Sequence, residues 1–258
     1  SPMSRGLGDV YKRQMNTYQE LGNSISLNQG AVWDETDNYP IYFNFDFTIG
    51  NQTYTALNVL AGGGVTFPGL GLKQLFVFHT PFGGYTLRDR GTSGSISTIS
   101  YQISGTPGQQ ILKVEWKNAG YAQWYPTSDP NDFIDFQIWF FESDSHIEVR
   151  FGDNNFTPAT YGYPATTSDS NPGTSFKFMH SDCSDMFGLQ GPADLPSYWF
   201  FDSCNPNYTF VDGTPSNGVT YNLHPDGVVA IEETTQLEVS ISPNPVSYTH
   251  LTLPTNGC

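Results

Sequence analysis

Apolar and polar residues alternate with a period of two along much of the chain, and no stretch has the 3.6-residue period of an amphipathic helix. From Phe43 to Ile49 every second residue is apolar and the residues between them are polar. The pair Gly50-Asn51 follows, which predicts a tight hairpin turn into a second strand at Thr53–Leu60. Because successive side chains of a strand point to opposite faces, these segments predict half-buried strands.

Two more hairpins are predicted in the middle of the chain. Ser95–Ser104 is joined to Ile111–Asn118 by a Gly-Thr-Pro-Gly turn, and Phe133–Phe141 is joined to His146–Phe151 by a short polar turn. Shorter strands are predicted at Gln74–His79, Ser175–Met179, Ser197–Asp202, Thr209–Val211 and Val219–Leu223. About ten to twelve short strands with hairpin turns predict an all-β fold, a two-sheet antiparallel sandwich of the jelly-roll or concanavalin-like type.

The alternation also predicts a polar outer face on three neighbouring strands. It would carry Lys113, Glu115, Lys117, Asp135, Gln137, Trp139, His146, Glu148 and Arg150. Jelly-roll glycoside hydrolases place two carboxylates on such a face, so Glu115 and Glu148 are the candidate catalytic residues. The E-x-D-x-x-E spacing of laminarinase-like enzymes is absent, however, and mixed charges on adjacent strands are equally typical of a solvated sheet face.

The chain is acidic, with a net charge of −15. Residues 1–14 hold three of its ten basic residues and one of its 25 acidic ones, so the rest carries −17. Such a field repels phosphates, and we therefore expect no nucleic acid as a partner. No stretch is long and apolar enough to predict a membrane span.

Two kinds of loop residue are candidates for binding. Tyr121, Trp124 and Tyr125 lie in a loop between strong strands, where aromatic rings either stack on sugars or cover an open end of the sandwich. Asp129 and Asp132 are the candidate ligands of a structural calcium ion, although solvated acidic loops are the default interpretation. No other cofactor is expected.

A strand-like segment near the end of the chain carries a resemblance. Leu237–Pro245 reads L-E-V-S-I-S-P-N-P, an alternating strand that runs into two prolines, and a polar linker at 228–236 precedes it. This segment resembles the opening of a C-terminal sorting domain of type IX secretion in Bacteroidota. The resemblance implies export through the type IX machinery to an extracellular or outer-membrane surface location.

A second resemblance lies in the body of the chain. Val114–Asn118 (V-E-W-K-N), Asp132–Glu142 and His146–Gly152 (H-I-E-V-R-F-G) look like three consecutive strands of a β-sandwich module in type IX-exported surface proteins. The resemblance covers about Tyr39 to Asp153. No catalytic residues are established for that module, so none are transferred to this chain.

The two ends of the chain look foreign to the fold. Residues 1–14 and 246–258 resemble translated sequencing-adapter sequence, and the alternative is a genuine disordered arm and tail. With the ends set aside, residues 15–227 are expected to form the sandwich domain, and 237–245 the start of a truncated sorting domain. In an exported protein, Cys183 and Cys204 are expected to form a disulfide, the alternative being two unpaired buried thiols.

These observations favour a non-catalytic extracellular β-sandwich module that functions in adhesion or in recognition of polysaccharide or surface protein. A polysaccharide-degrading hydrolase that uses Glu115 and Glu148 is the alternative from a different class. A structural spacer within a larger protein is the third interpretation.

Overall fold

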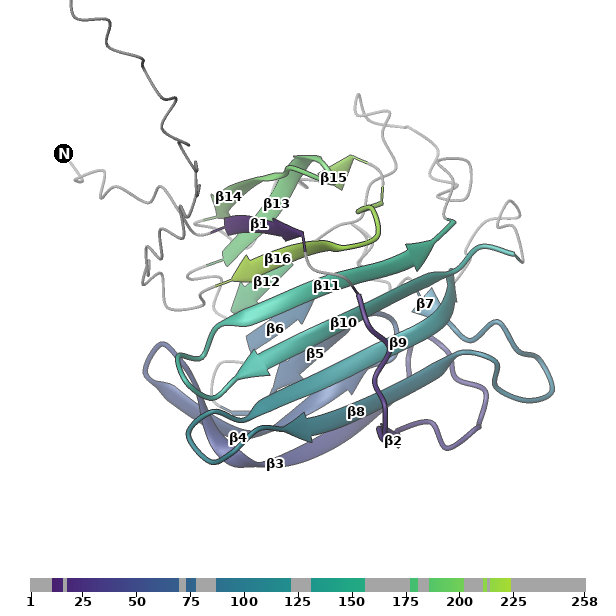
Figure 1. Cartoon of the computed structure of the whole chain (residues 1–258), viewed down its shortest axis with the longest axis horizontal. Helices are drawn as coiled ribbons and strands as arrows, with labels where there is room; N and C mark the ends of the chain where they lie inside the picture. Colours follow the sequence, from purple (N-terminus) through teal and green to yellow (C-terminus); the bar gives the residue numbers. More distant parts are fainter. Residues whose placement is uncertain are drawn as a thin grey trace, which may run out of the picture.

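The structure is a computed structural model that describes residues 11–15, 18–69, 73–77, 87–121, 131–155, 177–180, 186–201, 211–212 and 214–223. Within these residues the protein consists of two sheets of eight strands each, packed face to face (Figure 1). The predicted all-β, two-sheet antiparallel sandwich is confirmed. The described part of the chain contains no helix of the length and apolarity that a membrane crossing requires.

The first sheet, sheet A, contains the strands that carry the polar outer face. Its order is β1 (Tyr11–Met15), β16 (Val219–Leu223), β11 (Ile147–Asn154), β10 (Ile134–Phe141), β9 (Ile111–Tyr121), β8 (Thr98–Ser104) and β2 (Ile25–Ser26), and β7 (Leu87–Arg88) pairs with β9. All of its strand pairs are antiparallel.

The second sheet, sheet B, lies partly behind β8–β11 in Figure 1. Its order is β14 (Ser197–Phe201), β13 (Met186–Pro192), β12 (Lys177–His180), β6 (Lys73–Phe76), β5 (Gly64–Phe67), β4 (Gln52–Leu60) and β3 (Asn38–Ile49). The short β15 (Val211–Asp212) pairs with β13 in parallel.

The three predicted hairpins are confirmed. Ile49 of β3 pairs with Gln52 of β4 around Gly50, whose positive φ of 60° suits glycine at this turn. Ser104 pairs with Ile111 across the β8–β9 turn, and β10 and β11 pair from Phe140↔Ile147 back to Ile134↔Asn154. Turn chemistry and alternation were therefore sufficient to place the most regular part of both sheets.

The core lies between the sheets and is built by the apolar half of the alternation. Trp116 of β9 stacks on Phe136 of β10 with ring centres 4.6 Å apart, and both side chains are fully buried. The indole N–H of Trp116 donates to the carbonyl oxygen of Ala61 at 2.9 Å, and that of Trp33 to the carbonyl of Ser97 at 2.7 Å. These buried polar groups are thus satisfied, which removes the main cost of placing tryptophan in a core.

A segment that the alternation does not predict crosses sheet A on its outer side. We call residues 18–24, between β1 and β2, the strap. Figure 1 shows it running in front of β11, β10 and β9 toward β2, which pairs with β8 at Ile25↔Tyr101. The strap therefore covers part of the face on which the candidate catalytic residues lie.

Several predicted segments end differently or lie elsewhere. β1, β2, β7 and β13 were not predicted, and β3 begins at Asn38 rather than at Phe43. Four residues of the suspect segment 1–14, Tyr11 to Gln14, pair with β16, while the adapter origin of that segment stays a prediction. The predicted linker 228–236, sorting segment 237–245 and tail 246–258 lie outside the described residues.

Candidate functional site

The outer face of β9, β10 and β11 is the candidate site, and the register confirms that the predicted side chains share it. Gln137 of β10 pairs with Glu115 of β9 and with Arg150 of β11. Two residues further along, Trp139 pairs with Lys113 and with Glu148. The face thus consists of two adjacent rows of polar side chains across three central strands.

This face is not the solvated sheet face that mixed charges usually indicate. Gln137 is fully buried, and Glu115 and Asp135 are each 3% exposed. Burial of this kind requires that each polar group has a partner, because an unpaired buried carboxylate or amide is costly. The strap supplies many of these partners.

The strap is anchored mainly on one carboxylate and one amide. The Tyr18 hydroxyl donates to Glu115 Oε1 at 2.7 Å, and the Leu21 N–H donates to the same oxygen at 3.2 Å. Gln137 Nε2 donates to Glu115 Oε1 at 2.6 Å and to the Gln19 carbonyl at 2.7 Å. Glu115 is therefore the acceptor at the centre of the contact between strap and sheet.

Burial and these contacts shift two pKa values. Burial raises the pKa of Glu115 above the ordinary glutamate range, and the hydrogen bonds from Tyr18, Gln137 and Leu21 oppose that rise without cancelling it. Burial also raises the pKa of the Tyr18 hydroxyl well above its ordinary value, and the nearby Glu115 carboxylate adds to the rise. Tyr18 therefore remains a hydrogen-bond donor at any physiological pH.

The tyrosine ring of the strap requires a glycine beneath it. A Cβ atom at Gly152 of β11 would lie 2.8 Å from Cγ and Cδ1 of Tyr18. Gly152 lies beside a bulge, since the pairing of β10 with both neighbours shifts between Ile134 and Phe136. Asp135, inside that shift, accepts hydrogen bonds from Lys117 Nζ and from the Asn118 N–H, each at 2.6 Å. This end of the face is thus a closed network under the strap.

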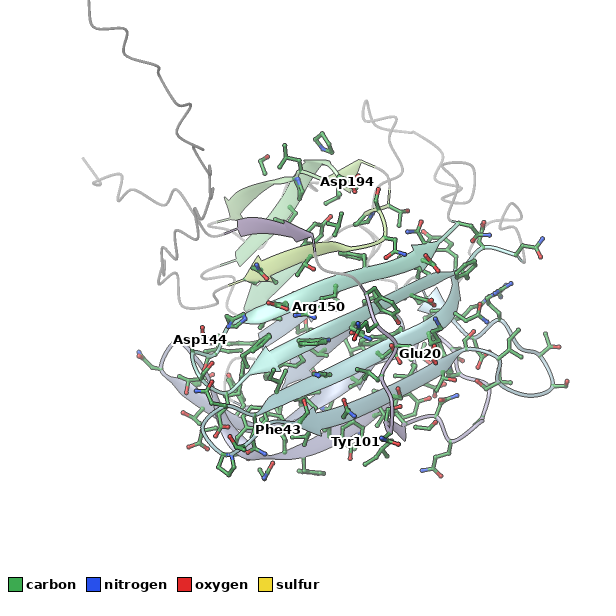
Figure 2. The ribbon with its side chains drawn as sticks, viewed as in Figure 1. Glu20, Phe43, Tyr101, Asp144, Arg150 and Asp194 are labelled. Carbon is green, nitrogen blue, oxygen red and sulfur yellow. The ribbon has the colours of Figure 1, made fainter. Side chains whose placement is uncertain are left out.

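The other end of the face is more open and holds an aromatic ring between two cations. Lys113 Nζ lies 4.1 Å from the centre of the Trp139 ring, and Arg150 Cζ lies 3.4 Å from it. All three side chains are half-buried. The Trp139 indole N–H donates to Gln137 Oε1 at 2.8 Å, which ties the open end to the buried network. Figure 2 labels Arg150 on β11 and Glu20 where the strap passes over the sheet.

Glu148 belongs to this open end and is held by Arg150 and His146. Arg150 Nε donates to Glu148 Oε2 at 2.6 Å, and His146 Nε2 lies 3.7 Å from Oε1. Burial would raise the pKa of Glu148, but the contacts with His146 and Arg150 outweigh it and bring the pKa below the ordinary range. Burial tends to lower the pKa of His146, but the contacts with Glu148 and Asp144 outweigh it and raise that pKa.

The two candidate catalytic carboxylates do not face each other across an open site. Glu115 and Glu148 are two strands and two residues apart, which corresponds to about 12 Å between their Cα atoms. Glu115 is hydrogen-bonded beneath the strap, and Glu148 is paired with Arg150. A glycosidase needs both carboxyl groups free to act on a substrate that lies between them. The contacts favour structural roles for both residues.

The remaining predicted site residues are distributed as follows. Tyr121 ends β9, is half-buried and packs against the core, as expected of a ring that covers an end of the sandwich. Asp132 is 3% exposed, and no group of three or more metal-ligating side chains occurs among the residues that the structure describes. The other candidates lie outside those residues: Trp124, Tyr125, Asp129 and the cysteine pair Cys183 and Cys204.

Two features of the site were missed by sequence reasoning. The alternation placed Lys113, Trp139 and Arg150 on one face, but nothing in it indicated that the two cations contact the same ring. The strap gave no periodic signal at all. The position of the strap is set by contacts with residues more than 90 positions away, such as those of Tyr18 and Leu21 with Glu115, and local sequence does not show these contacts.

Comparison with known proteins gives one match. Residues 10–174 match the sequence model of a family described as NIDO related. The matched range contains every strand of sheet A except β16, as well as β3 to β6 of sheet B. No curated protein and no solved structure matches the chain.

Proposed function

The chain belongs to the NIDO-related family, and from that membership we propose that it is a non-catalytic recognition module at a bacterial cell surface. Domains of this family are typical of extracellular proteins, so the chain is an extracellular type of β module. The finer proposal is adhesion or recognition of a polysaccharide or a surface protein. The resemblance of Leu237–Pro245 to a sorting domain supports export by type IX secretion.

One observation carries the non-catalytic part of the proposal. Both candidate catalytic carboxylates, Glu115 and Glu148, are engaged by partners of this chain, and the strap lies over the first of them. A general acid or a nucleophile must reach its substrate, and neither group is free to do so in this arrangement. The rigid double sheet, with one open end of its polar face, instead suits a surface that binds without turnover.

A combined binding and hydrolysis assay tests this proposal. The full chain is applied to an array of plant, algal and bacterial polysaccharides, and reducing-sugar release is measured on each polysaccharide that binds. We expect binding to at least one polysaccharide and no release above a heat-denatured sample. If sugar is released and Glu148→Gln abolishes the release, the protein is a hydrolase instead. If it binds no polysaccharide and no surface protein, a structural spacer is the interpretation that is left.

Export is tested separately in cells. The complete gene is expressed in a Bacteroidota strain with functional type IX secretion and in a strain that lacks it. We expect external protease to reach the protein only in the first strain. Equal external exposure in both strains would contradict the type IX route and would leave the binding proposal unaffected.

A further inference from the structure

Two cations approach one ring on the open half of the outer face. β10 lies between β9 and β11, so Lys113 and Arg150 reach the Trp139 ring from opposite sides. A ring covered in this way is not a platform on which a sugar can stack. Cation–π contact instead holds both charges at the surface, and the feature that the cluster presents outward is positive charge.

The charge of this cluster is not balanced within the described chain. Arg150 is paired with Glu148, with Nη2 2.5 Å from Oε2. Lys113 makes no hydrogen bond or ion pair with any residue that the structure describes, although it is half-buried. Burial and the neighbouring Arg150 lower the pKa of Lys113, as expected where a positive charge lacks a counter-ion. An anion bound here would restore the balance.

The cluster lies in a wider row of polar side chains. The register places four residues side by side across four strands, from β9 to β16: Lys113, Trp139, Glu148 and Asn222. The row ends at Lys113 because the next residue, Gln102 of β8, donates to the Gly22 carbonyl of the strap. At the usual strand spacing the row is about 14 Å long, which suits an extended chain molecule rather than a single ion. The side chains are polar throughout, apart from the tryptophan ring.

The surroundings favour a sugar chain over a peptide. An extended peptide gains most of its affinity by pairing its backbone with a free sheet edge. β9, β10 and β11 are each paired on both sides, so the row offers only side chains. Sugars bind through hydroxyl and carboxylate groups that such side chains can contact directly.

We propose that Lys113 and Arg150, held by Trp139, bind the carboxylate or sulfate group of an acidic polysaccharide that lies along this row. The proposal deepens the recognition function proposed above and rests on it. The acidity of the whole chain does not oppose it, because charges more than about 8 Å apart are largely screened at physiological salt. That acidity also removes the general attraction that makes basic proteins bind any polyanion.

The test is calorimetric titration of the full chain with four probes at physiological salt. The probes are oligogalacturonate for a carboxylate, a sulfated galactan oligomer for a sulfate, laminari-oligosaccharide for a neutral sugar and polyglutamate for an acidic peptide. We expect binding of oligogalacturonate or of the sulfated oligomer, which also identifies the anionic group. Lys113→Gln should weaken it about tenfold, since it removes a charge-assisted contact.

Two variants control for charge and folding. Lys113→Arg keeps the charge and should retain most of the affinity. Arg88→Gln removes one positive charge from an exposed position on β7, away from the row, and should leave the affinity unchanged. Because Lys113 has no hydrogen-bond or ion-pair partner in the described chain, Lys113→Gln is expected to fold normally, and its melting curve verifies this.

The outcomes separate this inference from the recognition function. Equal affinity of Lys113→Gln and the unchanged chain, or equal weakening by Arg88→Gln, would overturn the site. Binding of the neutral sugar alone would overturn the site and leave recognition standing. Binding of polyglutamate that depends on Lys113 would replace the sugar chain with an acidic peptide. Failure to bind any ligand here and on the array would overturn both proposals.

Discussion

Replacing Gly152 by alanine gives the sharpest test of the strap. The added Cβ would lie 2.8 Å from two ring atoms of Tyr18, where unstrained carbon contacts are about 3.5 to 4.0 Å. The ring must therefore shift by about 1 Å. Gly152 is not among the glycines with positive φ, so alanine fits the backbone and the cost comes from side-chain contacts. The Tyr18 ring gives the tightest of these contacts, and the Cβ of Asp135, at 3.0 Å from the added atom, gives a smaller one.

The expected loss of stability has two sources, the overpacking against the Tyr18 ring and the disturbed hydrogen bond from Tyr18 to Glu115. Overpacking of this kind costs about 1 to 3 kcal/mol. The shift also stretches the 2.7 Å hydrogen bond from Tyr18 to Glu115, and a hydrogen bond to a charged group is worth about 1.5 to 3 kcal/mol. Because the strap can relax in part, we expect Gly152→Ala to lower the free energy of unfolding by about 2 kcal/mol. That loss corresponds to a decrease in Tm of about 4 to 8 °C.

Urea unfolding followed by tryptophan fluorescence measures the effect in a double-mutant cycle. Gly152→Ala is made in the unchanged chain and in Tyr18→Ala, where the clashing ring is gone, and most of its cost should disappear in the second background. Gly22→Ala, in the strap itself, is the matched control, because nothing lies within 4 Å of the position that its added methyl group would take. If Gly152→Ala destabilised both backgrounds equally, the clash with Tyr18 would be refuted.

Three further predictions concern the network beneath the strap and the core. Because the pKa of Glu115 is raised in the fold, the contribution of Glu115 to stability decreases as the pH rises above about 4.5. Glu115→Gln should therefore flatten the dependence of the unfolding free energy on pH between about pH 4 and pH 7. An unchanged slope would contradict this prediction. Asp135→Asn should lower the free energy of unfolding in urea by about 2 kcal/mol, since it removes the buried carboxylate that pairs with Lys117. A loss below about 0.5 kcal/mol would show that the ion pair contributes little. Trp116→Phe should lower the free energy of unfolding by about 2 kcal/mol in the same assay, because it leaves the Ala61 carbonyl without its donor and opens a cavity. Unchanged stability would mean that the core repacks around the smaller ring.

The regular part of the fold could be predicted from sequence because local signals agree there. In β10 and β11 the alternation is uninterrupted and the turn residues lie where the hairpin needs them, so both strands and their inward faces were placed correctly. Val219–Leu223 was predicted with the bounds that β16 has. In each of these segments the alternation of apolar and polar residues is enough to show which side chains face the core.

The parts that were missed depend on contacts between distant residues. β13 reads M-F-G-L-Q-G-P, in which two glycines and a proline give no strand signal, yet it pairs with β12 and β14. The strap has no periodicity, because its position is set by Glu115 and Gln137 rather than by a buried stripe. The outer face looked solvated for the same reason, since the alternation shows which side a residue faces and not what lies over it.

Nuclear magnetic resonance of the tryptophan indole groups tests the central claim, that the open half of the outer face is the recognition surface. The full chain has five tryptophans, and Trp116 is a fully buried internal reference. On addition of an acidic oligosaccharide that binds, the indole N–H signal of Trp139 should shift with the fraction bound while that of Trp116 stays constant. A saturable shift at other residues, with the Trp139 signal unchanged, would contradict the account.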